Sequence, residues 1–136
     1  MTAAIKVNKL RKIYEGGLEA LKGIDLSIPQ GSFYGLLGPN GAGKTTTIGI
    51  ITGLVHLTNG TASVMGYDTI RDYRKARRLI GLSPQELNFD VFFSIGELLT
   101  LQAGYYGLSH SEAKERTTIM LQQFGLTEKR KSRARE

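Results

Sequence analysis

The pattern of apolar and polar positions changes character near Ser94. Before that point, apolar residues either alternate with polar ones or follow one another in short runs, and both patterns are typical of strands. They predict strands over 3–11, 20–29, 33–37, 61–66 and 79–83. Helices are expected between them, over 46–54 and 68–78. The first two thirds of the chain is therefore expected to mix strands and helices.

The last third is expected to be helical. Ser94 is followed three residues later by Glu97, and Ser109 is followed in the same way by Glu112. A serine with a glutamate at this spacing is a capping box, which opens a helix. Apolar residues at helical spacing continue each helix toward a glycine, a residue that commonly ends one. A third helix is expected from Glu128.

One stretch carries the candidate chemistry. Residues 38–46 fit the phosphate-binding pattern G-x-x-x-x-G-K-[ST], between an expected strand and an expected helix. Its glycines permit positive φ, so backbone N–H groups can turn inward and form a nest for anionic oxygens. The next helix adds its unpaired first N–H groups and the positive end of its dipole. The candidate nucleotide-binding residues are Gly38, Pro39, Asn40, Gly41, Ala42, Gly43, Lys44, Thr45 and Thr46.

Three side chains of this stretch have expected roles. Lys44 is a point charge suited to the β- and γ-phosphate oxygens. Thr45 offers a hydroxyl to Mg²⁺, which takes hard oxygen ligands. Thr46 is expected to donate to the α-phosphate. The alternative, a glycine-rich turn that precedes Lys-Thr by chance, is disfavoured by the strand and helix expected on either side.

Composition adds limits rather than a function. The chain has 136 residues, no cysteine and a net charge of +6, so disulfides and thiolate metal sites are excluded. No apolar run approaches the roughly 18 residues of a membrane span. The positive charge gathers in 71–78 and 127–136. These clusters predict either a surface for nucleic acid or an anionic membrane, or solvated helix faces. We expect the second.

Four features together resemble the ATP-binding subunit of an ATP-binding cassette (ABC) transporter, and within that family the ATPases of bacterial ABC-2 type export systems. They are the loop at 38–46, Tyr14 before a glycine turn, the segment Gly81–Glu86 with its glutamine, and the change to helices. The resemblance implies an α/β fold: a P-loop NTPase (ABC ATPase) core with an antiparallel β subdomain and the start of a helical subdomain. Residues 1–93 would hold the nucleotide-binding core and β subdomain, and 94–136 the start of the helical subdomain.

The resemblance also implies further site residues. Tyr14 matches the aromatic that stacks on adenine, although an ordinary half-buried aromatic at a strand end is an alternative. Gln85 matches the glutamine that reaches Mg²⁺ and the attacking water, and its alternative is a polar loop residue. The implied cofactors are ATP and Mg²⁺. Three aromatics, Phe89, Phe92 and Phe93, match the neighbourhood of the groove that receives a membrane subunit, with local core packing weighed equally.

The family's signature motif, second magnesium-linked aspartate, catalytic glutamate and γ-phosphate-sensing histidine do not occur in this sequence. We therefore expect an N-terminal fragment of a longer ATP hydrolase that binds MgATP weakly, has negligible turnover and has an unpaired strand edge. The intact protein would pair with a second cassette and a transmembrane permease, in the cytoplasm at the inner membrane face. A soluble ABC-type ATPase that acts on nucleic acid or ribosomes is the alternative. A P-loop kinase or GTPase is weaker, since no NKxD-type guanine motif occurs.

Overall fold

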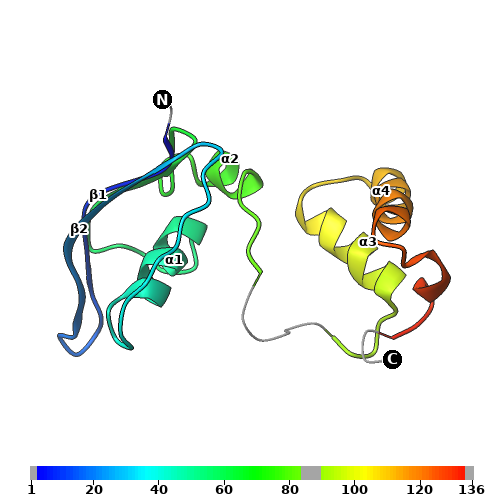
Figure 1. The fold of residues 1–136 in the computed structure, drawn as a ribbon, viewed down its shortest axis with the longest axis horizontal. Coiled ribbons are helices and arrows are strands. Elements are labelled where there is room, and N and C mark those ends of the chain that lie inside the picture. Colours follow the sequence, from blue (N-terminus) through cyan, green and yellow to red (C-terminus); the bar gives the residue numbers. More distant parts are fainter. Residues whose placement is uncertain (1–2, 84–89, 134–136) are drawn as a thin grey trace. The chain divides into compact units, whose positions relative to one another are not determined.

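The computed structural model describes residues 3–83 and 90–133, and the chain divides into two compact units, 1–82 and 83–136. Figure 1 shows the strands in the first unit and a helical hairpin in the second. Unit 1 contains β1 (Ala3–Ile13), β2 (Glu19–Pro29), α1 (Lys44–Thr52), β3 (Asn59–Val64), β4 (Tyr67–Asp68) and α2 (Tyr73–Arg78). Unit 2 contains α3 (Ile95–Tyr105), α4 (His110–Gln123) and a single 3₁₀ turn, η1 (Thr127–Lys129).

The sheet of unit 1 is antiparallel and has the order β2-β1-β3-β4. β1 and β2 form a long hairpin, and its turn contains Gly16 and Gly17, both with positive φ. The predicted alternation along β1 breaks at Lys9, which has a φ of 44° beside a register shift. This irregularity lets both Val7 and Leu10 face the core, where they are almost fully buried.

The core of unit 1 joins the sheet to α1 and α2. Figure 1 shows α1 lying alongside the β1–β2 ribbon. Its buried cluster comprises Val7, Leu10, Leu21, Ile50, Ile51, Ala62, Val64 and Ala76. Because Ile50 and Ile51 supply the contribution of α1, they fix the helix on the sheet and so set where its first turn lies. Helix α1 begins two residues before the predicted start and ends at Gly53, which adopts the left-handed conformation.

Unit 2 is built on the two predicted capping boxes. The Ser94 hydroxyl accepts from the Glu97 amide, while the Glu97 carboxylate accepts from the Ser94 amide at 2.8 Å and from its hydroxyl at 2.7 Å. These hydrogen bonds, first the one from the hydroxyl, lower the pKa of Glu97. Ser109 and Glu112 repeat the arrangement at α4, with the same effect on the Glu112 pKa. Both predicted helix starts are confirmed.

Two predicted strands, 33–37 and 79–83, are wrong. Neither segment belongs to a ladder, and Phe33 and Leu37 are almost fully exposed. A strand needs a neighbouring strand to take its backbone hydrogen bonds, and none of the described strands pairs with either segment. The amides of Leu79 and Ile80 instead donate to the carbonyls of Ala76 and Arg77, at the end of α2. Tyr34, Leu36, Ile80 and Leu82 instead line a cavity of about 270 Å³ beside α1.

The predicted helix over 68–78 is wrong in its first half. Tyr67 and Asp68 form strand β4, and only Tyr73–Arg78 is helical. The Asp68 carboxylate accepts hydrogen bonds from the amides of Ile70 and Arg71, at 2.8 and 2.9 Å. An aspartate that bonds forward to its own backbone in this way favours a turn over a helix. The third helix expected from Glu128 is likewise reduced to the short turn η1.

Candidate functional site

The loop that leads into α1 has a backbone that only glycine adopts easily. Gly41 and Gly43 both have a φ of 82°, in the left-handed region. The chain turns between them and Pro39, whose carbonyl accepts a hydrogen bond from the Ala42 amide at 3.2 Å. Residues 38–42 are exposed, and Gly43 and Lys44 are half-buried. The loop is therefore a surface feature with its far end anchored at the helix.

The N-terminus of α1 is open, unlike those of α3 and α4. Its cap residue, Gly43, has no side chain to accept from the helix, and the first turn holds no acidic residue. The first intrahelical bond is donated by the Thr47 amide to the Gly43 carbonyl at 2.8 Å. The amides of Lys44, Thr45 and Thr46 precede the first bond of the helical ladder, so they remain available to an anion.

Lys44 reaches back across this loop. Its ammonium donates to the carbonyl oxygen of Gly38 at 2.5 Å and to that of Pro39 at 2.7 Å. A positive charge is thus held over the turn at 38–42, beside the open end of α1. The same ammonium can exchange these carbonyls for phosphate oxygens, which are stronger acceptors because they carry charge.

Gly43 also holds the loop against the sheet. A Cβ at this position would come 2.5 Å from Leu21 Cδ2 and 2.8 Å from the Ala20 carbonyl oxygen, both on β2. Leu21 pairs in register with Lys12 of β1. The floor of the loop is therefore the β1–β2 hairpin, a relationship for which the sequence pattern gave no signal.

Tyr14 lies beside the first turn of α1. Its hydroxyl is 3.2 Å from the Thr46 hydroxyl, and the residue is 37% exposed. Two predicted site residues that are distant in the sequence are therefore in contact. The Lys12 ammonium lies over the Tyr14 ring, 4.9 Å from its centroid. Lys12 is not among the residues that the sequence pattern singled out.

Of the two predicted magnesium ligands, Thr45 and Gln85, only Thr45 is among the described residues. Thr45 is exposed in the first turn of α1. Gln85 and Phe89 lie outside the described residues, so their roles stay predictions. Within the described ranges, no group of three or more His, Cys, Asp or Glu side chains is arranged to hold a metal ion. Any Mg²⁺ at this loop would depend mainly on the phosphates and water for its ligands.

The basic cluster at 71–78 is largely engaged with tyrosines. The Arg74 and Arg77 guanidinium groups each lie 5.6 Å from the Tyr73 ring centroid, and the Lys75 ammonium lies 5.4 Å from that of Tyr67. Three of the cluster's cationic side chains thus lie over rings of the chain itself. The arrangement favours a solvated helix face over a nucleic-acid surface.

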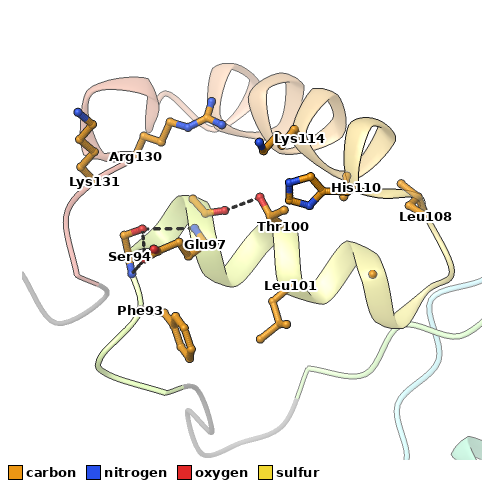
Figure 2. A pocket seen from close by; sticks show the side chains of 13 residues that line it. Phe93, Ser94, Glu97, Thr100, Leu101, Leu108, His110, Lys114, Arg130 and Lys131 are labelled. Atoms are coloured by element: carbon orange, nitrogen blue, oxygen red, sulfur yellow. Dashed lines mark hydrogen bonds between the residues drawn. The ribbon is translucent and has the colours of Figure 1, made fainter.

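A separate groove of about 680 Å³ lies in unit 2, along α3 and α4 (Figure 2). Phe93 and Leu101 lie on its apolar side, and Lys114, Arg130 and Lys131 supply positive charge. Arg130 is fixed by a hydrogen bond to the Thr118 hydroxyl at 3.0 Å. The lining of the groove therefore combines apolar and positively charged side chains.

Comparison with known proteins decides the family. The sequence profile of the family described as ABC transporter matches residues 21–136. The chain belongs to the ABC transporter family. This ABC transporter chain is therefore expected to share the family's α/β P-loop fold, and the solved relatives support that fold.

Curated relatives of this ABC transporter chain are ATP-binding proteins. It is similar to the linearmycin resistance ATP-binding protein LnrL of Bacillus subtilis (strain 168), at 40% identity over 95% of this chain and 41% of that protein. It is 38% identical to the daunorubicin/doxorubicin resistance ATP-binding protein DrrA of Streptomyces peucetius, over 95% of this chain and 39% of that protein. The chain thus spans about two fifths of the length of these relatives.

A solved ATP-binding subunit of an ABC transporter has the same fold. It superposes with a TM-score of 0.79 at 30% identity, over 96% of this chain and 54% of that chain. The predicted fold class, a P-loop NTPase core with an antiparallel β subdomain and the start of a helical subdomain, is confirmed. Among the described helices of this ABC transporter chain, none is both long and apolar enough to cross a membrane.

Proposed function

We propose that residues 38–46 bind the triphosphate of MgATP, and that the chain is the nucleotide-binding part of an ABC transporter ATPase. The observation that carries this proposal is the open N-terminus of α1, which follows a left-handed glycine loop and has neither a side-chain cap nor an acid in its first turn. Such an end attracts an anion through its free N–H groups and its dipole.

Each loop residue has a proposed part in this binding. The backbone N–H groups of Gly38, Asn40, Gly41, Ala42 and Gly43 form the nest, and Pro39, which has no N–H group, shapes the turn. Lys44 moves its ammonium from the Gly38 and Pro39 carbonyls to the β- and γ-phosphates, and its position over the turn supports this exchange. Thr46 donates to the α-phosphate. Tyr14, in contact with Thr46, supplies the surface on which adenine stacks.

The proposed magnesium site fits this donor set. A single hydroxyl from Thr45 suits Mg²⁺, which commonly takes one or two protein ligands and completes its shell with phosphates and water. Gln85 is proposed as a second ligand and as the group that positions the attacking water, on the resemblance alone. The bound ion would supply charge neutralisation at the phosphates. The chain's own residues grip the nucleotide around it.

The whole protein is proposed to hydrolyse ATP and drive export. The two relatives named as drug resistance ATP-binding proteins support assignment to the ABC-2 export group. In this proposal the chain pairs with a second cassette and a transmembrane permease, at the inner face of the membrane. Residues 1–93 serve nucleotide binding, and 94–136 begin the helical subdomain.

The permease contact is proposed for the surface around Phe92 and Phe93. Phe92 is 80% exposed and Phe93 is 40% exposed, and Phe93 also lines the groove of unit 2. Exposed aromatic residues are enriched where proteins bind one another. Their exposure supports the docking interpretation over local core packing, for these two of the three predicted aromatics.

Calorimetric titration with MgATP tests the proposal. A measurable heat and a rise in melting temperature are expected for material that circular dichroism shows to be folded. Absence of both on folded material would overturn it. Titration with DNA and RNA at several salt concentrations tests the nucleic-acid alternative, for which binding would weaken steeply as salt rises. Transporter ATPases need no such binding.

A further inference from the structure

Lys12 is placed against the proposed base-binding aromatic. It is half-buried near the end of β1, and its ammonium lies 4.9 Å from the Tyr14 ring centroid. This distance is within the range of about 6 Å at which an ammonium and an aromatic ring attract each other. Lys12 therefore covers part of one face of the Tyr14 ring, while Tyr14 as a residue remains 37% exposed.

Tyr14 is also held from other directions. Its hydroxyl lies 3.2 Å from that of Thr46. Its backbone amide donates to the Leu18 carbonyl at 2.9 Å, and its carbonyl accepts from the Gly17 amide at 3.0 Å. With the backbone, hydroxyl and one ring face all engaged, the ring is fixed before any ligand arrives. A surface fixed in this way binds more tightly because less freedom is lost on binding.

Among the described residues, no acid neutralises the charge of Lys12. Within the part of the chain that the structure describes, the ion pair of this hairpin joins neighbouring Arg11 to Glu19 at 2.6 Å, and no carboxylate is paired with Lys12. Lys12 also pairs in register with Leu21, on which Gly43 of the loop packs. An uncompensated positive charge thus lies one strand away from the phosphate-binding loop, on the same side of the hairpin end as Tyr14.

We propose that Lys12 is a positioning residue for the nucleotide base: its ammonium covers one face of the Tyr14 ring, and a purine stacks on the opposite face. The inference rests on the proposed function, because it requires a nucleotide at residues 38–46. The ammonium draws π-electron density toward itself, so the opposite face becomes less negative and better suited to an electron-rich aminopurine. Lys12 acts through Tyr14 and does not touch the phosphates.

The test compares MgATP and MgADP affinities of Lys12→Met with those of the unchanged chain. Methionine keeps much of the length of lysine and removes the charge. We expect binding about two- to fivefold weaker, by the same factor for both nucleotides, because the base is common to them. Lys12→Arg should restore affinity. The matched control is Lys22→Met, which removes an exposed charge from the adjacent strand without a ring contact, and it should bind as the unchanged chain does.

A second readout reports the stack directly. The chain has no tryptophan, so Tyr14→Trp introduces a single tryptophan at the proposed base site. Nucleotide should quench this fluorescence, and adding Lys12→Met should shift the emission of the free protein and weaken the quenching titration. Melting temperatures of all variants establish that each is folded.

The failures are distinguishable. If neither the unchanged chain nor Tyr14→Trp responds to MgATP, the proposed function fails, and this inference with it. If MgATP binds and Lys44→Ala weakens it, but Lys12→Met does not, only the inference is overturned. It is equally overturned if Lys22→Met matches Lys12→Met, or if the loss is larger for ATP than for ADP, since either result would assign Lys12 a general electrostatic effect.

Discussion

The guanidinium of Arg77 donates a 2.8 Å hydrogen bond to the carbonyl oxygen of Gly53, the residue that ends α1. The Arg77 side chain packs closely against Gly53: a Cβ added to Gly53 would lie 2.8 Å from Arg77 Nε. The helix that opens toward the proposed phosphate site is therefore closed at its other end by a cation from α2. A positive charge at a helix C-terminus satisfies its last carbonyls and opposes the negative end of the dipole.

Arg77→Gln is expected to destabilise unit 1 by about 1 kcal/mol, because the C-terminus of α1 loses both a charged donor and a favourable charge. Denaturant unfolding measures the change. Arg78→Gln is the matched control, since Arg78 is adjacent and exposed and is expected to leave stability within about 0.5 kcal/mol. Equal losses in the two variants would show that the Gly53 contact contributes nothing.

Lys44→Ala is expected to lower MgATP affinity by roughly 1.5–3 kcal/mol, about ten- to a hundredfold, because a charged hydrogen bond to phosphate is removed. Calorimetry measures the affinity. Lys6→Ala, an exposed lysine on β1, should leave it unchanged. An unaltered affinity in Lys44→Ala would remove Lys44 from the phosphate site.

Gly43→Ala is expected to destabilise the loop in two ways, through its backbone conformation and through a steric clash. A left-handed conformation costs a non-glycine residue about 1–2 kcal/mol, and the added Cβ would also collide with Leu21 and Ala20. Gly17→Ala is the control, because Gly17 has a similar φ of 84° and no atom within 4 Å of the added Cβ. Melting temperature and MgATP affinity should both fall further in Gly43→Ala, and parity between the two variants would contradict the packing argument.

Tyr14→Ala is expected to lower MgATP affinity by about 1–3 kcal/mol if the ring stacks on adenine. Tyr14→Phe should lose less than about 1 kcal/mol, since it keeps the ring and removes only a neutral, exposed contact with Thr46. Calorimetric titration of both variants checks the order. Losses of equal size would mean that the hydroxyl, and not the ring face, carries the interaction.

Acid is expected to loosen unit 2 through its capping boxes. The folded state lowers the pKa of Glu97 and of Glu112, through the serine hydroxyl first and the serine amide second. The stabilisation is therefore complete above the unfolded glutamate pKa, about 4.3, and is lost as pH falls through the lower folded value. Helical circular dichroism against pH measures it.

Glu97→Gln is the informative variant for this acid transition. Glutamine keeps the capping geometry but does not titrate, so the transition should weaken. Glu115→Gln, on the exposed face of α4, should leave the transition unchanged. An identical acid transition in Glu97→Gln and the unchanged chain would exclude a contribution from the Ser94–Glu97 box.

The elements with strong local signals were predictable. The capping boxes of α3 and α4 and the hairpin strands depend on residues close in the sequence, and the structure has them where the pattern indicates. The segments 33–37 and 79–83 failed because apolar composition specifies an extended chain but not its ladder partner. The Asp68 carboxylate accepts hydrogen bonds from the amides of Ile70 and Arg71 and so replaces the predicted helix with a turn, a choice that composition does not reveal.

The candidate site was predictable in its loop and not in its surroundings. Lys44 and its neighbours are contiguous, so a pattern finds them. Lys12 and Tyr14 are two residues apart, a spacing that places two side chains on the same face of an extended chain, but the sequence alone does not show that the ammonium lies over the ring. Leu21 supports Gly43 only because the hairpin folds under the loop. The contact between Leu21 and Gly43 depends on tertiary geometry that no local spacing encodes.

The hydrogen bonds from Lys44 to the Gly38 and Pro39 carbonyls make the loop selective for negatively charged ligands. In the absence of ligand, the two carbonyls accept the hydrogen bonds of the ammonium. Only a ligand that is more strongly negative than a carbonyl displaces them. An uncharged nucleoside such as adenosine has no negatively charged oxygen to displace them. Adenosine would contact only the aromatic surface and would leave Lys44 bonded to the two carbonyls. The phosphates, more than the base, therefore decide whether Lys44 exchanges its hydrogen-bond partners.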